Sequence, residues 1–192
     1  AGNPMDLQPG DRLTLRDALY STLLGSDNVS ALTVASFVGR DLVSRRGGGA
    51  PIAAFVAEMN NLARSLRMAK TRFTAPHGLD AGNSVSTSCA LDMALLGVYS
   101  MQNPAFCYIV SQASRRIEVQ SQTKGRTMYD ISNNNRLMSA SGVDGIKAGT
   151  SRAAGPCLLL SVTRNAISRR SPQTGTEVIY PQRMIIAVLG SA

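Results

Sequence analysis

Residues 144–163 read DGIKAGTSRAAGPCLLLSVT and contain one of the two apolar runs that decide the fold class. That run, CLLLSVT at 157–163, is short and compatible with a β-strand, and MIIAVL at 184–189 has the same character. The segment between them, 164–183, carries two adjacent arginines, two prolines and a glycine, so it predicts a long basic loop. The end of the chain therefore predicts two strands joined by an extended connection.

Strand patterns also precede this region. Residues 116–122 alternate between apolar and polar side chains, Gly125 suits a turn, and residues 126–131 can return as the second strand of a hairpin. From about residue 105 onward, the chain therefore predicts mainly antiparallel strands.

The first half of the chain predicts helices instead. We expect them around residues 15–24, 28–43 and 88–101, and a further one that begins at Pro51, since proline fits the first turn of a helix. The apolar side chains after Pro51 recur at spacings of three and four and form one face: Ile52, Phe55, Val56, Met59, Leu62, Ala63 and Leu66.

This order, helices at about 11–103 and then strands at about 105–192, indicates an α+β fold. Two or three strands form a poor sheet by themselves. The chain also begins on a Pro-Gly-Asp turn at 9–11 and ends on its last predicted strand. We therefore expect residues 1–192 to be part of a domain.

Composition narrows the class of protein. With 44% hydrophobic residues among 192, the chain can bury a substantial core, which excludes disorder. No apolar run approaches the ~18 residues that a membrane span needs. The net charge of +8 favours an anionic partner such as an acidic membrane face or an acidic polymer. Nucleic acid is not expected, because the aromatic residues, 5% of the chain, do not interleave with the arginines.

Metal ligands are scarce in this sequence. His77 is the one histidine, and Cys89, Cys107 and Cys157 lack the spacing of a zinc site. The cysteines lie among apolar residues and are expected to behave as small hydrophobic side chains. We therefore expect neither a metal nor another cofactor.

Two short motifs carry chemistry. Ser26-Asp27-Asn28 lies between two predicted helices, and Asp144-Gly-Ile-Lys147-Ala148-Gly149-Thr150 precedes the strand region. Each motif alone is a weak signal. Their order and their separation of about 120 residues match the second and third signatures of the active-site-serine enzymes that react with penicillin. The first signature of these enzymes is Ser-x-x-Lys.

On these motifs the chain resembles the D-alanyl-D-alanine carboxypeptidases of the low-molecular-mass penicillin-binding type. The resemblance covers residues 9–190 with two insertions. The stretches that carry it are PGDRLTLRDALYSTLLGSDNVSALTVA, FVAEMNNLARSLRMAKTRFTAPHGLD, VSTSCALDMALLG, NNNRLMSASGVDGIKAGTSRAAGPCLLLSV and MIIAVLG. It implies a β-lactamase/transpeptidase-like fold, in which helices flank a mostly antiparallel sheet beside a helical subdomain.

The resemblance also implies catalytic roles. Ser26 would bridge the family's base lysine and Lys147 and relay a proton to the departing D-alanine. Asn28 would bond the substrate's peptide backbone, facing Lys147 across one cleft. Lys147 would bind the terminal carboxylate and help to keep the base lysine neutral.

The third signature supplies the remaining substrate contacts and one departure from the family. Gly149 would leave the strand edge bare so that substrate can pair with the backbone. Thr150 would offer its hydroxyl to the carboxylate and its N–H to the oxyanion hole. Ala148 stands where the family usually has a hydroxyl residue.

The family's nucleophile lies on Ser-x-x-Lys, roughly sixty residues before Ser-x-Asn, and only 25 residues precede Ser26. We therefore expect it upstream of Ala1. The chain's own Ser121-x-x-Lys124 falls in the wrong order beside Gly125. We interpret it as the tip of a hairpin, since a working pair needs one helical turn.

Three other residues invite functional interpretations. His77, in a Pro-His-Gly turn, is expected to fix the loop by hydrogen bonds. Glu58 invites comparison with the deacylating glutamate of class A β-lactamases, but it lies in a predicted helix and is expected to be exposed. Asp144 could pair with a cation, although Asp-Gly before a strand usually forms a turn.

The leading hypothesis is a serine D,D-carboxypeptidase that acts through an acyl-enzyme on the D-Ala-D-Ala end of peptidoglycan stem peptides. β-Lactams would be its covalent inhibitors, and its place would be outside the cytoplasm, in the periplasm or at the cell wall. Ala148 and the absent nucleophile motivate an alternative, a non-catalytic binding module on the same fold. A class A-like β-lactamase ranks third.

Overall fold

A computed structural model describes residues 2–79 and 85–191. Five helices come first: α1 (Leu15–Leu23), α2 (Asn28–Arg46), α3 (Pro51–Ser65), α4 (Ala90–Ser100) and α5 (Pro104–Val110). Five strands follow: β1 (Ser114–Ser121), β2 (Gly125–Ser132), β3 (Val143–Ser151), β4 (Gly155–Arg170) and β5 (Glu177–Val188). The expected α+β class and the order of helices before strands are confirmed.

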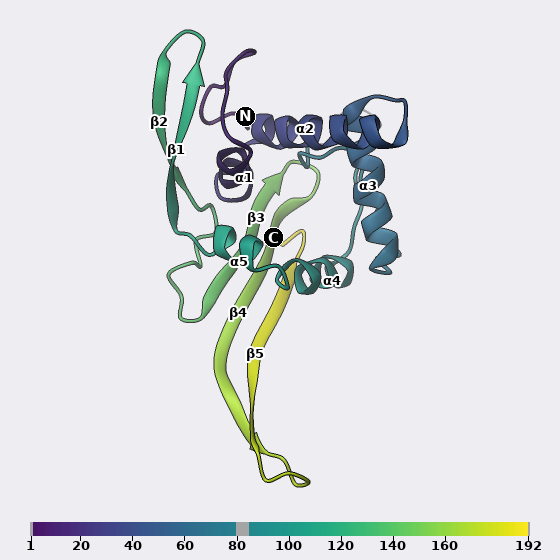
Figure 1. Ribbon diagram of the computed structural model, residues 1–192, viewed down its shortest axis with the longest axis vertical. Helices are drawn as coiled ribbons and strands as arrows, with labels where there is room; N and C mark the ends of the chain where they lie inside the picture. Colours follow the sequence, from purple (N-terminus) through teal and green to yellow (C-terminus); the bar gives the residue numbers. More distant parts are fainter. Residues whose placement is uncertain (1, 80–84, 192) are drawn as a thin grey trace.

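The strands form two antiparallel sheets (Figure 1). β1 and β2 make the predicted hairpin, with Ser121 opposite Gly125 at its tip. The second sheet has the order β3-β4-β5, so β3 lies at its edge. Helix α4 packs on β4 and β5, and α5 packs on β3. Helices α2 and α3 pack on each other to one side of the sheet.

The predicted loop at 164–183 is wrong. β4 continues to Arg170 and β5 begins at Glu177, and a short turn joins them. The register pairs Ile167 with Tyr180, and such β-branched and aromatic side chains favour strands. Pro181 is tolerated because β5 is an edge strand and the register shifts nearby, between 164 and 167.

The structure also corrects the expected start of strands at about 105, because α5 occupies that position. Asn103 caps α5: its side-chain oxygen accepts from the backbone N–H of Ala105 and of Phe106, at 2.9 and 3.2 Å. Pro104 fills the first helical position. The Asn-Pro pair thus starts a second helix shortly after α4 ends at Ser100.

Two small hydrophobic clusters hold these elements together. The larger one joins α1 to the β1–β2 hairpin and consists of Met5, Leu7, Tyr20, Leu24, Ile117, Val119 and Ile131. The smaller one joins α4, α5 and β3 through Met101, Val110 and Ile146. Ile146 immediately precedes Lys147, so the second cluster fixes the strand that carries the third signature.

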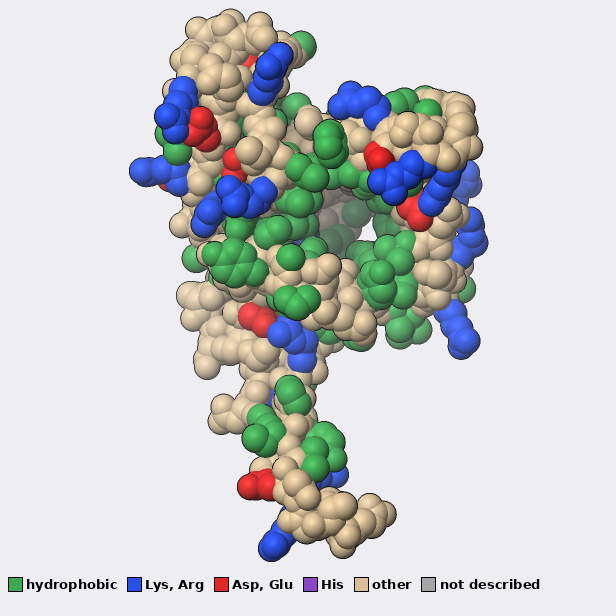
Figure 2. Space-filling model, viewed as in Figure 1, with side chains coloured by type: hydrophobic (Ala, Val, Ile, Leu, Met, Phe, Trp, Pro, Cys, Tyr) green, Lys and Arg blue, Asp and Glu red, His purple; other side chains and the backbone are tan. Residues whose placement is uncertain are grey.

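Large apolar side chains remain on the surface of several elements. Of the face predicted for α3, only Ala63 is fully buried. On α4, Leu91 is 71% and Val98 51% exposed. Figure 2 shows such side chains around an opening between the helices and the sheet. Within the described residues, no helix combines the length and apolarity required to cross a bilayer.

Candidate active site

The first functional motif lies in the turn between α1 and α2. Asp27 caps α2, because its carboxylate accepts a hydrogen bond of 2.8 Å from the backbone N–H of Ser30. Its own N–H donates to the carbonyl of Ser21 at 3.2 Å. Ser26 between them has a left-handed backbone, with φ of 58°. Two helix ends therefore fix the position of the Ser26 hydroxyl.

The second motif lies on β3. Lys147 pairs with Leu159 of β4, and the residue is half-buried. The Lys147 ammonium donates hydrogen bonds to Ser26 Oγ and to the carbonyl of Ala148. Two residues 121 positions apart in sequence thus meet through their side chains.

The surroundings of Lys147 change its acid–base chemistry. Burial lowers the pKa of Lys147 from 10.5 to about 8, because the charged ammonium loses hydration. In the described part of the chain, no carboxylate forms an ion pair with it. Near pH 8, a substantial fraction of Lys147 is therefore neutral.

Two asparagines that the sequence interpretation missed connect the motifs. Asn134 Nδ2 donates to Ser26 Oγ at 3.2 Å and to the carbonyl of Gly25 at 3.0 Å. Asn135 is buried, and its Nδ2 donates to the carbonyl of Gly145 at 3.3 Å, two residues before Lys147. The signal was the run Asn-Asn-Asn at 133–135, which begins one of the stretches that resemble the family.

The other predicted site residues lie apart from this junction. The backbone N–H of Asn28 donates to the carbonyl of Gly2 at 2.7 Å, and a Cβ built on Gly2 would lie 1.9 Å from Asn28 Nδ2. The Asn28 side chain therefore packs against Gly2. Among the described residues, it forms no hydrogen bond with Lys147.

Gly149 and Thr150 lie further along β3. A Cβ built on Gly149 meets no atom within 4 Å, and the edge of β3 that does not face β4 carries no other strand of the described chain. Thr150 is exposed, and strand alternation places its side chain on the opposite face of the sheet from Lys147. Gly149 thus leaves the edge open, whereas Thr150 does not contact the Ser26–Lys147 pair.

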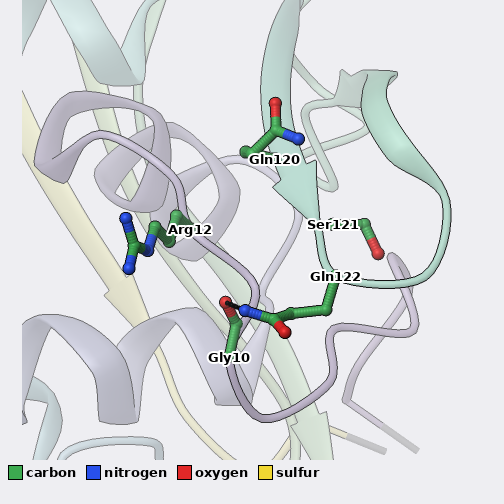
Figure 3. Close-up of a pocket in the computed structure, with 5 residues that line it drawn as sticks. All are labelled: Gly10, Arg12, Gln120, Ser121 and Gln122. Carbon is green, nitrogen blue, oxygen red and sulfur yellow. Dashed lines mark hydrogen bonds between the residues drawn. The ribbon is translucent and has the colours of Figure 1, made fainter.

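The chain's own Ser-x-x-Lys sequence has a different environment. Ser121 and Lys124 flank the β1–β2 turn, and Lys124 Nζ lies 3.6 Å from the Asp6 carboxylate. Figure 3 shows Ser121 at a shallow pocket where Gln122 Nε2 donates to the carbonyl of Gly10 at 3.2 Å. The interpretation as a hairpin tip is confirmed.

The remaining candidates have structural partners. His77 Nδ1 accepts from the backbone N–H of Leu79 at 3.0 Å and so fixes its turn, as predicted. Glu58 pairs with Arg46 at 2.7 Å on the helical surface. Asp144 lies within β3 and pairs with Arg183 of β5 at 2.9 Å, so the alternative of a cation partner is correct and the turn is not.

No metal site emerges from the part of the chain that the structure describes. No three His, Cys, Asp or Glu side chains gather there in a way that could hold an ion. The three cysteines are free and half-buried.

Solved structures identify the class of protein that this fold defines. A mutant of the Streptomyces K15 DD-transpeptidase matches with a TM-score of 0.76 and 26% identity, over 100% of this chain and 66% of that chain. A penicillin-binding protein homolog from Mycobacterium tuberculosis matches with a TM-score of 0.75 and 27% identity, over 98% of this chain and 60% of that one. The predicted transpeptidase-like fold of the penicillin-binding proteins is confirmed.

The sequence comparisons then give the family. The model of the D-alanyl-D-alanine carboxypeptidase family, peptidase S11, matches residues 2–171, and the chain belongs to this family. D-alanyl-D-alanine carboxypeptidase DacC of Escherichia coli is 32% identical over 85% of this chain and 38% of its own length. A D-alanyl-D-alanine carboxypeptidase of Streptomyces sp. strain K15 is 29% identical over 81% of this chain and 52% of its own length. The chain therefore spans about two fifths to half of these relatives.

Proposed function

We propose that the whole protein is a serine-type D-Ala-D-Ala carboxypeptidase, and that Ser26 and Lys147 form the proton-relay side of its active site. The observation that carries the proposal is the hydrogen bond from the Lys147 ammonium to Ser26 Oγ. A hydroxyl between two amines is the arrangement that moves a proton toward a leaving amine. Membership of the carboxypeptidase family supports this chemistry.

The reaction would proceed through an acyl-enzyme. A nucleophilic serine outside these 192 residues attacks the carbonyl of the penultimate D-alanine and gives its proton to a neighbouring base lysine. That proton passes through Ser26 Oγ to the nitrogen of the terminal D-alanine as the C–N bond breaks. Water then hydrolyses the ester. The Lys147 ammonium holds the Ser26 hydroxyl in place and contributes positive charge toward the substrate's carboxylate.

Exposed apolar side chains on the helices support the presence of an additional segment that supplies the nucleophile. Leu91 and Val98 of α4, which are 71% and 51% exposed, require a partner if they are to be buried. Figure 2 shows an opening beside these helices that such a segment could fill. The relatives, of which this chain spans about two fifths to half, have the additional length.

The substrate would be a peptidoglycan stem peptide that ends in D-Ala-D-Ala, with β-lactams as covalent inhibitors. The open edge of β3 at Gly149 suits an extended peptide that adds to the sheet through its backbone. Ala148 supplies no hydroxyl and the Thr150 side chain lies on the opposite face of β3 from Lys147, so the carboxylate contact falls to Lys147, and Thr150 would contribute its backbone N–H to the oxyanion hole. Asn28 would contact the peptide backbone once the substrate is bound. Such a substrate places the enzyme outside the cytoplasm, at the cell wall.

The test uses the whole protein, including the sequence beyond these residues. Fluorescent penicillin should label it covalently, and D-alanine should be released from a peptide that ends in D-Ala-D-Ala. Lys147→Ala should slow acylation strongly, whereas the matched change Lys124→Ala should leave it unaltered. Equal labelling of the two variants would reject the assigned site.

A second candidate is a binding module without catalysis, and Ala148 is the residue that favours it. This alternative predicts that the whole protein binds the D-Ala-D-Ala peptide reversibly and releases no D-alanine. Release that follows multiple-turnover kinetics would eliminate it. A class A-like β-lactamase lacks support, because Glu58 is occupied by Arg46 on the outer surface of α3.

A further inference from the structure

The outer part of the β4–β5 hairpin, residues 164–183, projects well beyond the rest of the molecule, and we call it the arm (Figure 1). Helix α4 packs on the sheet further in, where Gly97 lies against Leu159 and Ile185. Side chains of the arm are exposed throughout, apart from the half-buried Ser171 and Gln182. The arm is therefore a two-stranded ribbon with solvent on both faces.

The register of the arm defines what each face presents. Ile167 lies opposite Tyr180 and Arg169 opposite Val178, so these four side chains share one face. On that face Ile167 is 44% and Tyr180 47% exposed. The other face carries Ile179, which is 66% exposed, together with Arg170. One face therefore combines Ile167, Val178 and Tyr180 with Arg169, and the other combines Ile179 with Arg170 and with Glu177 opposite it. Figure 2 shows apolar, basic and acidic side chains on the visible side of the arm.

The arm is also positively charged. Its arginines are at positions 164, 169, 170 and 183, and Glu177 is its one acidic residue. Arg183 pairs with Asp144 at the base of the arm, while Arg164 and Arg169 form no ion pair among the described residues. Together with the net charge of +8 on the chain, this makes an anionic surface the complementary partner.

From these features we infer that the arm docks on the surface of an anionic lipid bilayer. A polyanion in water would engage the arginines but leave Ile167, Ile179 and Tyr180 exposed. A bilayer interface accommodates both, because isoleucine enters the acyl boundary, tyrosine lies at the headgroup level and arginine pairs with lipid phosphates. Docking would also support the ribbon, since two strands alone are only marginally stable in water.

The position of the arm determines what docking does to the rest of the molecule. Lys147 pairs with Leu159, and Arg169 lies ten residues further along β4. At ~3.3 Å per residue, that is roughly 33 Å of strand. A docked arm therefore holds the Ser26–Lys147 junction at a distance from the bilayer. This inference does not depend on the proposed catalytic function, and the two can fail separately.

A tryptophan reporter tests contact directly, because the chain contains no tryptophan. Tyr180→Trp places one at the arm, and Phe37→Trp places a control on α2, where Phe37 is 53% exposed. Vesicles of equal parts phosphatidylglycerol and phosphatidylcholine should shift the emission of Tyr180→Trp to the blue. Pure phosphatidylcholine vesicles should not, and Phe37→Trp should not respond to either. Absence of the shift, or equal shifts at both positions, would overturn the proposal.

Charge and apolar variants then separate a bilayer from other partners. Arg169→Glu with Arg170→Glu should weaken binding to the anionic vesicles at least about 25-fold, from about fivefold per basic residue. Arg45→Glu with Arg46→Glu makes the same charge change on α2 and should weaken binding much less. Ile179→Ser should weaken it as well, without changing charge.

Three results would contradict bilayer docking. If the two double arginine variants lost vesicle binding equally, binding would depend on the charge of the whole molecule and not on the arm. If Ile179→Ser kept full binding, and the same arginines captured soluble polyglutamate, the partner of the arm would be a polyanion. A dimer that forms without lipid, and that Ile179→Ser dissociates, would assign the arm to a second copy of the chain.

Discussion

Two serine–lysine pairs in this chain differ in their spacing along the sequence, in their contacts and in their burial. Ser121 and Lys124 are three positions apart, yet the Lys124 ammonium turns to Asp6 in solvent. Ser26 and Lys147 are 121 positions apart, yet they form a hydrogen bond, and burial lowers the pKa of that lysine to about 8. Closeness in the sequence therefore does not bring a serine and a lysine into contact. The Ser26–Lys147 contact depends instead on the turn that holds Ser26 and on the strand that carries Lys147.

The largest expected effect comes from removing the Ser26 hydroxyl. Ser26→Gly suits the left-handed backbone at this position, so the fold should be retained. Release of D-alanine by the whole protein should fall about 10²-fold or more, the usual size of a lost proton-transfer group. Ser121→Ala, the corresponding change in the other pair, should leave the rate of D-alanine release within about twofold of that of the natural protein. If Ser26→Gly and Ser121→Ala reduced the release of D-alanine to a similar extent, neither serine would have a specific role in the reaction.

The next largest effect should be the pH dependence of stability that Lys147 produces. Lys147 titrates at about 8 in the folded chain and at 10.5 when unfolded, so the unfolded chain binds more protons between these values. Below pH 8, burial of the Lys147 charge lowers the free energy of unfolding by its full amount. This penalty disappears as the pH rises through 10.5.

The measurement is the difference in unfolding free energy between the natural chain and Lys147→Met. From pH 7.5 to 10, the natural chain should gain about 2 kcal/mol relative to this variant. A flat result for Lys147→Met would show that its ammonium remains hydrated.

A smaller effect should follow from loosening the connection between the motifs. Asn135→Ala removes the hydrogen bond to the Gly145 carbonyl and the acceptor that receives the Leu137 N–H at 3.1 Å. We expect a loss of about 1–2 kcal/mol in urea unfolding, since buried groups are left unpaired. The control Asn165→Ala, on the exposed arm, should change stability by less than about 0.5 kcal/mol. Equal changes in unfolding free energy for Asn135→Ala and Asn165→Ala would mean that Asn135 does not stabilise β3.

The smallest effect should belong to the exposed pair. Lys124→Ala removes an ion pair in which the lysine and Asp6 side chains are 52% and 71% exposed. We expect a change of less than about 0.5 kcal/mol, which should vanish in high salt. A larger loss by thermal unfolding would show that the hairpin tip contributes to stability and would weaken the contrast between the two lysines.

Much of the fold could be predicted from local pattern. The apolar spacing after Pro51 located α3, and the alternation around Gly125 located the β1–β2 hairpin. The arm was missed because its prolines and arginines are typical of loops, whereas pairing with the opposite strand holds it extended. Helix α5 was missed because it is short and its capping residue, Asn103, follows the end of α4 at Ser100 by only three positions.

The order of its motifs and the periods of its apolar residues are properties of the sequence itself. They determined the family, the α+β class and the choice of Ser26 and Lys147. Only the tertiary structure decided that these two side chains meet, that Asn134 and Asn135 brace them, and that Asn28 packs on Gly2. The physical reason is that burial and hydrogen bonding between distant segments depend on how the helices and sheets pack. No local pattern of residues encodes the loss of water that gives Lys147 its altered chemistry.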